Sequence, residues 1–137
     1  MRRTLSRRYF LGATGAALPA GRAAARYAPN DTIDLALVGC GARGRTLLIP
    51  RFQKLPGVRF TAVCDVNAKH LAQGRELAGG SRVAAYHDYR RLLEDKNVDA
   101  VIIATNQQWH LLTMVAACQA GKDVYLEKPL GNSAGEG

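Results

Sequence analysis

The sequence predicts an α/β domain in which helices cover both faces of a doubly wound parallel sheet. Short apolar runs typical of buried strands alternate with segments of helical spacing from residue 33 to residue 126. A glycine-rich turn follows the first run, and glycines close two of the later segments. The 137 residues, 47% of them hydrophobic, are sufficient for one such domain.

The first part of the pattern comprises two strands and the helix between them. Residues 33–38 form a short, mostly apolar run that ends at Gly39, which favours a buried parallel strand. Residues 42–54 carry apolar side chains at near-helical spacing, and Pro50 should kink or shorten that helix. Residues 58–64 predict the second strand.

The middle of the pattern is a helix, a weak strand and a short helix. Residues 68–78 predict the first of these helices, because a pair of glycines follows and stops it. Residues 83–86 predict a weak third strand. Asp88 is then in place to cap a short helix that runs to Leu93.

The last part contains the clearest strand of the chain, at residues 100–104. Residues 108–120 predict a helix with Gly121 as its C-terminal stop, and residues 123–126 predict a fifth strand. Right-handed crossovers between such strands place helices on both faces of one sheet.

The turn after the first strand has the pattern G-x-G-x-x-G, over residues 39–44. It follows a predicted strand and opens a predicted helix, and Asp65 lies 21 residues beyond its last glycine, at the end of the next strand. This setting predicts a dinucleotide-binding turn. The alternative is a glycine-rich turn in an α/β domain that binds no nucleotide.

Each glycine of this turn has an expected task. Gly39 would allow the tight turn, Gly41 would let the backbone approach a pyrophosphate, and Gly44 would let the helix pack closely on the strand. The N–H groups of the helix that begins near Ala42 and Arg43 would then stabilise the negative charge of the pyrophosphate.

The acid at the end of the second strand predicts the form of the dinucleotide. Asp65 would accept hydrogen bonds from the adenosine ribose, and its charge repels a 2′-phosphate, so NAD is predicted over NADP. Arg43 and Arg45 keep NADP as the alternative, because a guanidinium near the ribose could accommodate the extra phosphate. The interpretation preferred for both arginines is a solvent-facing charge on the helix.

Charge and cysteine content argue against several other classes of protein. The net charge is +8, but residues 1–25 hold five arginines and no acid, and without them 14 basic and 11 acidic residues leave +3. The remaining basic residues are interleaved with acids, so no nucleic-acid partner is predicted. Three cysteines lie far apart without a ligand cluster, so no metal site is predicted. Two of them, Cys40 and Cys64, are expected to be small buried thiols.

Residues 1–25 resemble a bacterial Tat export signal. Arg7 and Arg8 form a twin-arginine pair, a weakly hydrophobic stretch occupies residues 11–20, and the three alanines 23–25 offer a cleavage site. A disordered basic arm or a mitochondrial-type presequence is the alternative.

The Tat interpretation divides the chain into a signal peptide (1–25), a linker (26–32) and a nucleotide-binding domain (33–137). It implies passage through the Tat translocase and a periplasmic or secreted protein. Because that route carries folded proteins, it also predicts a tightly held cofactor that is loaded before export.

Three segments together resemble the Gfo/Idh/MocA oxidoreductases, a family that includes glucose–fructose oxidoreductase and inositol dehydrogenase. They are residues 35–44, the pairs Ala104-Thr105 and Trp109-His110, and residues 121–130. The Glu-Lys-Pro signature at 127–129 is far more specific than the glycine turn. The resemblance covers residues 33–137, implies an NAD(P)-binding Rossmann domain and, with the leader, is similar to the exported subset of the family.

The resemblance makes Lys128 the candidate catalytic residue. The lysine of the Glu-Lys-Pro signature sits beside the nicotinamide in the family and contacts the reacting hydroxyl. An ammonium there can polarise a hydroxyl or carbonyl oxygen and help to relay its proton. Glu127 would position the lysine and the cofactor, and Pro129 would fix the loop, with a cis bond as a hypothesis.

Residues after the fourth strand are expected to contact the cofactor near its nicotinamide half. These are Thr105 and Asn106, the latter replacing a proline that is frequent in the family. His110 resembles a family histidine and is interpreted as a cofactor-pocket or packing residue rather than the base. His70 and His87 lack motif context and are expected on the surface.

In the family a sixth strand and a second α+β domain follow, so this chain is expected to be truncated before that domain. The second domain would hold the substrate, supply the acid/base partner of Lys128 and mediate a homo-oligomer, and residues 26–137 alone should show little turnover. The full-length protein is predicted to transfer hydride between NAD(P) and a sugar or polyol carbon. The alternatives are an NAD-dependent glycoside hydrolase of the same architecture and a non-catalytic dinucleotide-binding module.

Overall fold

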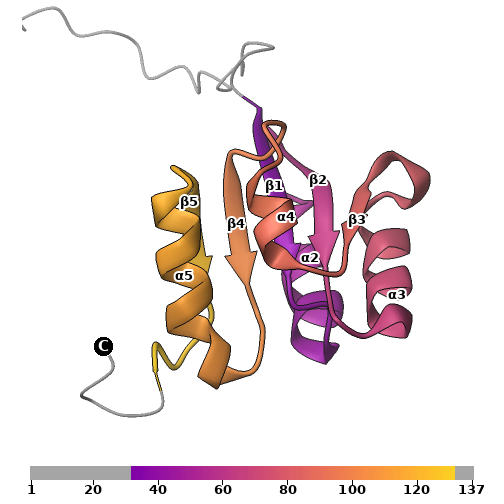
Figure 1. Cartoon of the computed structure of the whole chain (residues 1–137). Coiled ribbons are helices and arrows are strands. Elements are labelled where there is room, and N and C mark those ends of the chain that lie inside the picture. The colour runs from indigo at the N-terminus through magenta and orange to yellow at the C-terminus, as the bar shows by residue number, and fades with distance from the viewer. Residues whose placement is uncertain (1–31, 132–137) are drawn as a thin grey trace, which may run out of the picture.

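Five strands form one parallel sheet in the order β3-β2-β1-β4-β5 (Figure 1). The computed structural model describes residues 32–131, so the predicted signal peptide and nearly all of the predicted linker lie outside the described residues. The strands are β1 (Ile33–Val38), β2 (Val58–Cys64), β3 (Ala84–Tyr86), β4 (Ala100–Ile103) and β5 (Asp123–Leu126). This order confirms the predicted doubly wound sheet.

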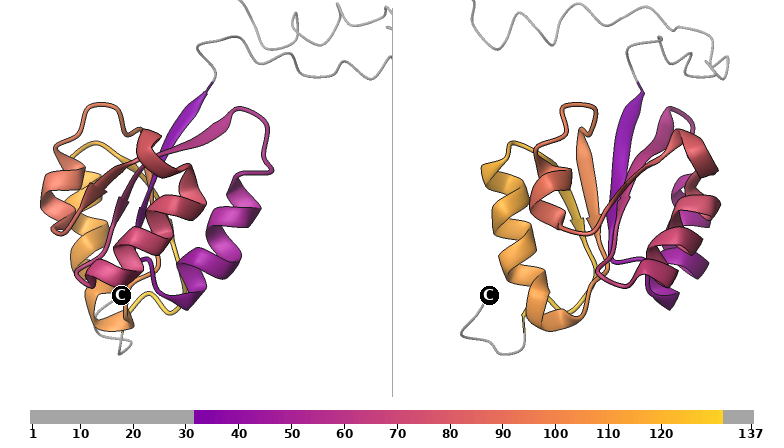
Figure 2. Two further views of the ribbon diagram at one scale, coloured as in Figure 1. Left: turned by 90° about the vertical axis from the view of Figure 1, so that its right-hand side faces the viewer. Right: turned by 45° about the vertical axis from the view of Figure 1, so that its right-hand side comes forward.

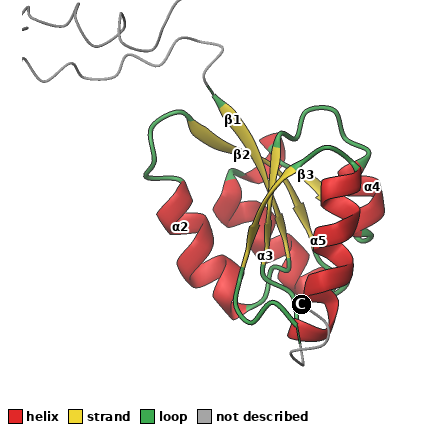
Figure 3. Ribbon diagram, turned by 90° about the vertical axis from the view of Figure 1, so that its left-hand side faces the viewer, coloured by secondary structure: helices red, strands yellow, loops and turns green. Residues whose placement is uncertain are grey.

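Helices cover both faces of the sheet (Figures 2 and 3). On one face lie η1 (Gly44–Leu48), α2 (Ile49–Phe52) and α3 (Ala68–Ala78), and the short turn η2 (Gly80–Arg82) follows α3. On the other face lie α4 (Tyr89–Leu93) and α5 (His110–Gln119), which is preceded by the short turn η3 (Gln107–Trp109).

The central strand is buried on both sides, which explains why its sequence is a continuous apolar run. Leu35 and Leu37 of β1 belong to the core cluster under α2 and α3. Ala36 and Val38, which alternate with them, belong to the cluster under α4 and α5. A parallel sheet covered on both faces requires apolar side chains at successive positions.

The parallel register brings the carboxyl ends of the central strands to one edge. Val38 of β1 pairs with Cys64 of β2 and with Ile103 of β4, and Ile103 pairs with Leu126 of β5. The residues that follow these strands therefore gather at the same edge; they are Gly39, Asp65, Ala104 and Glu127.

The helix after β1 departs from its predicted form. Residues 42–52 are helical without a break, but Gly44–Leu48 form a π-turn in which the N–H of Ile49 donates to the carbonyl of Gly44. Pro50, which has no N–H to donate, lies in the first turn of α2, directly after this wider turn. The helix ends at Phe52, two residues before the predicted end.

Other boundaries differ by one or two residues. The segment predicted as one helix over 108–120 is a 3₁₀ turn followed by α5, because the chain turns more tightly at Gln107–Trp109. The predicted caps are confirmed: Asp88 accepts the N–H of Arg90 at 2.9 Å, and Gly121 has φ of +72°. Within residues 32–131, no helix has the length and apolar character needed to cross a membrane.

Candidate functional site

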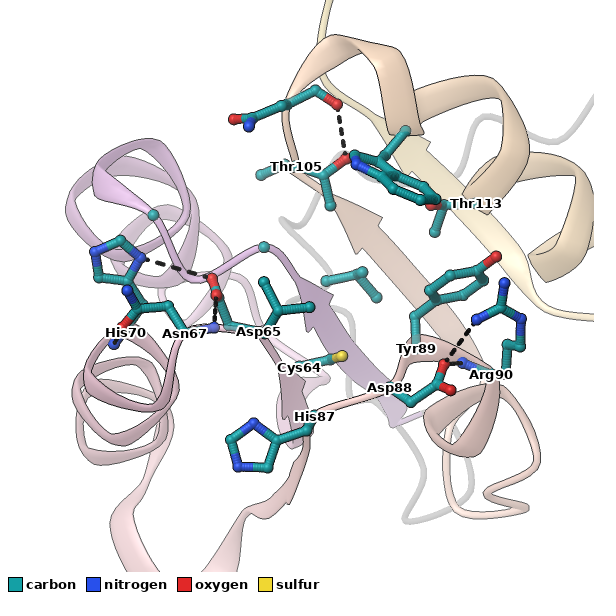
Figure 4. Close-up of a pocket in the computed structure, with 17 residues that line it drawn as sticks. Cys64, Asp65, Asn67, His70, His87, Asp88, Tyr89, Arg90, Thr105 and Thr113 are labelled. Carbon is teal, nitrogen blue, oxygen red and sulfur yellow. Dashed lines mark hydrogen bonds and ion pairs between the residues drawn. The ribbon is translucent and has the colours of Figure 1, made fainter.

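A cavity of about 540 Å³ opens at the edge where β1, β2 and β4 end (Figure 4). Five of its lining residues are predicted cofactor residues: Gly39, Gly41, Asp65, Thr105 and Asn106. The wall continues onto the segment after β3 and onto η3 and α5, through residues 87–90, Trp109 and Thr113. The position matches the crevice in which open α/β sheets bind their ligands.

Two glycines of the turn are required by close packing. A Cβ on Gly39 would lie 2.6 Å from the carbonyl carbon of Ala104, and the residue has φ of +100°. A Cβ on Gly44 would lie 2.3 Å from the carbonyl oxygen of Gly39. Gly39 therefore allows the turn to pass close to the end of β4, and Gly44 lets the helix approach the turn.

Gly41 differs from both, because a Cβ built on it meets no atom within 4 Å. It lies at the cavity rather than against the protein, so packing does not require a glycine here. An open backbone at this position is what the close approach of a phosphate needs. The turn therefore fits a dinucleotide.

Asp65 is already engaged by backbone donors. Its Oδ2 accepts the N–H of Cys40 at 2.7 Å, and its Oδ1 accepts the N–H of Asn67 at 2.8 Å. Figure 4 shows this carboxylate between Asn67 and His70, whose Nδ1 lies 3.9 Å from Oδ2. Asp65 thus ties the glycine turn to the start of α3, a task that the sequence analysis did not foresee. His70, expected on the surface, is partly buried in the cavity wall.

Replacing Asp65 with serine should change both stability and cofactor choice. Two charge-assisted hydrogen bonds are lost from a side chain that is 11% exposed. The free energy of unfolding, measured in urea, should therefore fall by roughly 3 kcal/mol. Calorimetric titration should show weaker NADH binding and a ratio of affinities shifted towards NADPH. Asp123→Ser, on an exposed residue at the other end of the sheet, is the control. Reduced stability with an unchanged affinity ratio would mean that Asp65 acts only on the turn.

The two cysteines near the turn are structural. Cys40 and Cys64 are buried and free, and Cys40 Sγ donates to the carbonyl of Cys64 at 3.6 Å. Burial, reinforced by the nearby charge of Asp65, raises the pKa of both thiols to about 12. At neutral pH neither carries the thiolate that nucleophilic chemistry requires. In residues 32–131, no three His, Cys, Asp or Glu side chains are grouped to hold a metal ion.

Gly74 is a contact that the sequence analysis missed. A Cβ on this α3 residue would lie 2.6 Å from Cys40 Sγ, so a glycine is needed for the helix to pack against the turn. The available signal was a glycine in the interior of a predicted helix, which frequently marks a close approach.

The Glu-Lys-Pro loop is joined to the glycine turn by an ion pair. Glu127 is 8% exposed, and its carboxylate accepts from Arg43 Nε at 3.0 Å and from Nη2 at 3.3 Å. Tyr125 OH donates to the same carboxylate at 3.5 Å. Arg43 is exposed, as the solvent-facing interpretation expects, but its guanidinium also contacts a carboxylate 84 residues away, which was not predicted.

His110 contacts two loops through its two ring nitrogens. Nδ1 lies 2.7 Å from the carbonyl oxygen of Pro129, and Nε2 lies 3.1 Å from that of Thr105. The ring is 2% exposed and does not line the cavity. The Lys128–Pro129 bond is cis, as hypothesised, and the exposed Lys128 follows the buried Glu127.

The fold and this edge define a nucleotide-binding domain of the doubly wound α/β class. Residues 33–137 match the Gfo/Idh/MocA family model, described as an oxidoreductase family with an NAD-binding Rossmann fold. The chain belongs to this family, which confirms the resemblance drawn from its motifs.

Individual relatives cover the same region. The chain is 34% identical over 117 residues to a Glycosyl hydrolase family 109 protein of Saccharopolyspora erythraea, covering 80% of this chain and 25% of that protein. It is 35% identical over 103 residues to an inositol 2-dehydrogenase/D-chiro-inositol 3-dehydrogenase of Shouchella clausii, covering 75% and 30%.

The same part of the chain is also similar to solved structures. The 3-ketoreductase KijD10 from Actinomadura kijaniata, in complex with TDP-benzene and NADP, has a TM-score of 0.69 at 27% identity, covering 77% of this chain and 32% of that one. The chain thus spans between a quarter and a third of the length of the proteins it matches.

Proposed function

We propose that the full-length protein is an NAD(P)-dependent oxidoreductase acting on a hydroxyl-bearing carbon of a sugar or polyol. The observation that carries this is the ion pair of Arg43 with Glu127, which joins the glycine turn to the loop that bears Lys128. A phosphate-binding turn and a candidate proton-transfer group then belong to one site. The inositol dehydrogenase among the relatives supports the substrate class.

In this site each residue has a distinct task. Gly41 leaves the backbone open to the pyrophosphate, and Asp65 offers its carboxylate to the ribose. Glu127 and His110 hold the loop on either side of Lys128. The Lys128 ammonium would polarise the substrate oxygen and help to move its proton. A nicotinamide bound there supplies hydride transfer.

The test uses the full-length protein with NAD or NADP and a panel of polyols and sugars. The expected result is substrate-dependent formation of reduced nicotinamide, followed by its absorbance. Calorimetry on the same sample should show dinucleotide binding. Binding without turnover on any substrate would favour the non-catalytic module.

A glycoside hydrolase that uses NAD is the second candidate, favoured by the family 109 relative. It would release a sugar from a glycoside while the absorbance of reduced nicotinamide returns to its starting value. Chromatography of the sugars, run beside the absorbance assay, therefore separates the two functions.

We propose further that residues 1–25 are a Tat signal peptide and that the protein is periplasmic or secreted, with a cofactor loaded before export. The twin arginines Arg7 and Arg8 and the alanines 23–25 support this. Replacing both arginines with lysine (Arg7→Lys, Arg8→Lys) should retain the protein in the cytoplasm, as fractionation would measure. Export that continues in this variant, or rapid cofactor loss from the mature protein, would contradict the proposal.

We also propose that the full-length protein has a second domain and assembles through it. A following α+β domain would hold the substrate, provide the acid/base partner of Lys128 and mediate a homo-oligomer. Light scattering on the full-length protein, compared with residues 1–137, tests whether assembly requires the additional segment.

A further inference from the structure

One polar atom in the cavity wall has no partner. Thr113, on α5, is 1% exposed and lines the cavity, and its Oγ1 makes no hydrogen bond to any part of the chain described by the structure. In a helix, a threonine hydroxyl can donate a hydrogen bond to the carbonyl four residues earlier, but the Thr113 hydroxyl does not do so. A buried hydroxyl without a partner destabilises a fold, so its presence here requires an explanation.

The surroundings of this hydroxyl suit a flat aromatic ring. Trp109 precedes Thr113 by four residues, so both lie on one side of the helical segment, and Trp109 is 48% exposed at the cavity. Val66, directly after Asp65, is 88% exposed at the same cavity. Tyr89 on α4 points towards Thr113 (Figure 4). Apolar walls around a few polar groups are the usual lining of a site for a base or other aromatic ligand.

The groups that share this cavity indicate which ring this is. Gly41 is the open position for the pyrophosphate, Asp65 is the candidate for the ribose, and Trp109 and Thr113 line the same cavity. His110, in contrast, reaches towards Pro129 and the Lys128 loop without lining the cavity. The adenosine half of a dinucleotide would therefore occupy the Thr113 side, and the nicotinamide half the Lys128 side.

We propose that the Thr113 hydroxyl binds the edge of the adenine ring of the cofactor, with Trp109 packed against the ring face. A hydroxyl can donate to a ring nitrogen or accept from the exocyclic amine, and adenine offers both. This inference rests on the proposed dinucleotide binding and names the residue that recognises the base.

The proposal predicts effects of opposite sign on stability and on binding. Thr113→Val keeps the shape and removes the unpaired hydroxyl, so the melting temperature of the ligand-free chain should rise by a few degrees. The same change should weaken NADH and ADP-ribose binding by about 3- to 10-fold. Binding of reduced nicotinamide mononucleotide, which lacks adenosine, should not change. Thr113→Ser, which keeps the hydroxyl, should retain the affinity.

The experiment is isothermal titration of the 137-residue chain with these three ligands, beside thermal unfolding. Thr61→Val is the matched control, because Thr61 Oγ1 donates to the carbonyl of Asn97 at 3.1 Å and lies outside the cavity. It should lower stability and leave all three affinities unchanged. Trp109, the only tryptophan of the sequence, also gives a fluorescence signal for NADH.

Each failure has a distinct signature. Unchanged ADP-ribose affinity in Thr113→Val, or an equal loss for the mononucleotide, would overturn the role of Thr113 while dinucleotide binding stands. If the unchanged chain binds neither NADH nor ADP-ribose, the proposed function fails and this inference fails with it. Should Thr113→Val not fold, weak ADP-ribose binding by a folded Thr113→Ala, restored in Thr113→Ser, supports the proposal, and unchanged binding overturns it.

Discussion

Gly44→Ala is expected to abolish dinucleotide binding and to destabilise the domain by roughly 3 kcal/mol. The new Cβ would lie 2.3 Å from the carbonyl oxygen of Gly39 and 3.0 Å from Cδ2 of Leu37. The first of these atoms belongs to the backbone, so it cannot move away without displacing the whole turn. Urea unfolding measures the loss of stability, and calorimetric titration with NADH measures the loss of binding.

Gly41→Ala is the matched control for this change. A Cβ added to Gly41 would meet no atom within 4 Å, so the free energy of unfolding should change by less than about 1 kcal/mol. The methyl group would nevertheless enter the space that a pyrophosphate approaches, so NADH affinity should still fall at least about tenfold, roughly 1.4 kcal/mol. Normal NADH binding by Gly44→Ala would show that the turn does not hold the pyrophosphate.

Lys128→Met in the full-length protein should lower kcat by about 10²- to 10⁴-fold. The change removes the ammonium that would act on the substrate oxygen and keeps a side chain of similar length. NADH affinity should stay within a few-fold, because the glycine turn and Asp65 are untouched. Initial rates with the substrate found in the panel, together with NADH titration, test both statements.

Lys122→Met is the control that separates chemistry from structure. Lys122 Nζ donates to the carbonyls of Asp95 at 2.8 Å and Val98 at 2.7 Å, at the opposite end of the sheet from Lys128. Its loss should lower stability and leave kcat unchanged. If the two lysine variants have the same kcat as the unchanged protein, Lys128 is not a catalytic residue.

The fold could be predicted largely from local signals. A strand buried on both faces is a continuous apolar run, as at 33–38, and helix ends carry their own residues, such as Asp88 and Gly121. The lengths of the helices could be predicted less well, because the π-turn at Gly44–Leu48 and the 3₁₀ turn at Gln107–Trp109 depend on how the chain packs.

Part of the candidate site could be predicted from spacing, where one residue type has one task. The glycines and Asp65 were predicted in this way, and the structure places Gly39, Gly41 and Asp65 at the cavity. The pairing of Arg43 with Glu127 was not, because the two are 84 positions apart and neither has a neighbour that signals the other. The unpaired hydroxyl of Thr113 was also invisible, since only the folded cavity wall shows that nothing meets it.

The imidazole of His110 has a mechanical consequence for the site. It touches the backbones of Thr105 and Pro129, which belong to loops after two different strands. Neither loop can shift alone without breaking one of these contacts. The ring therefore fixes the position of one loop relative to the other, and one of the two is the loop that bears Lys128.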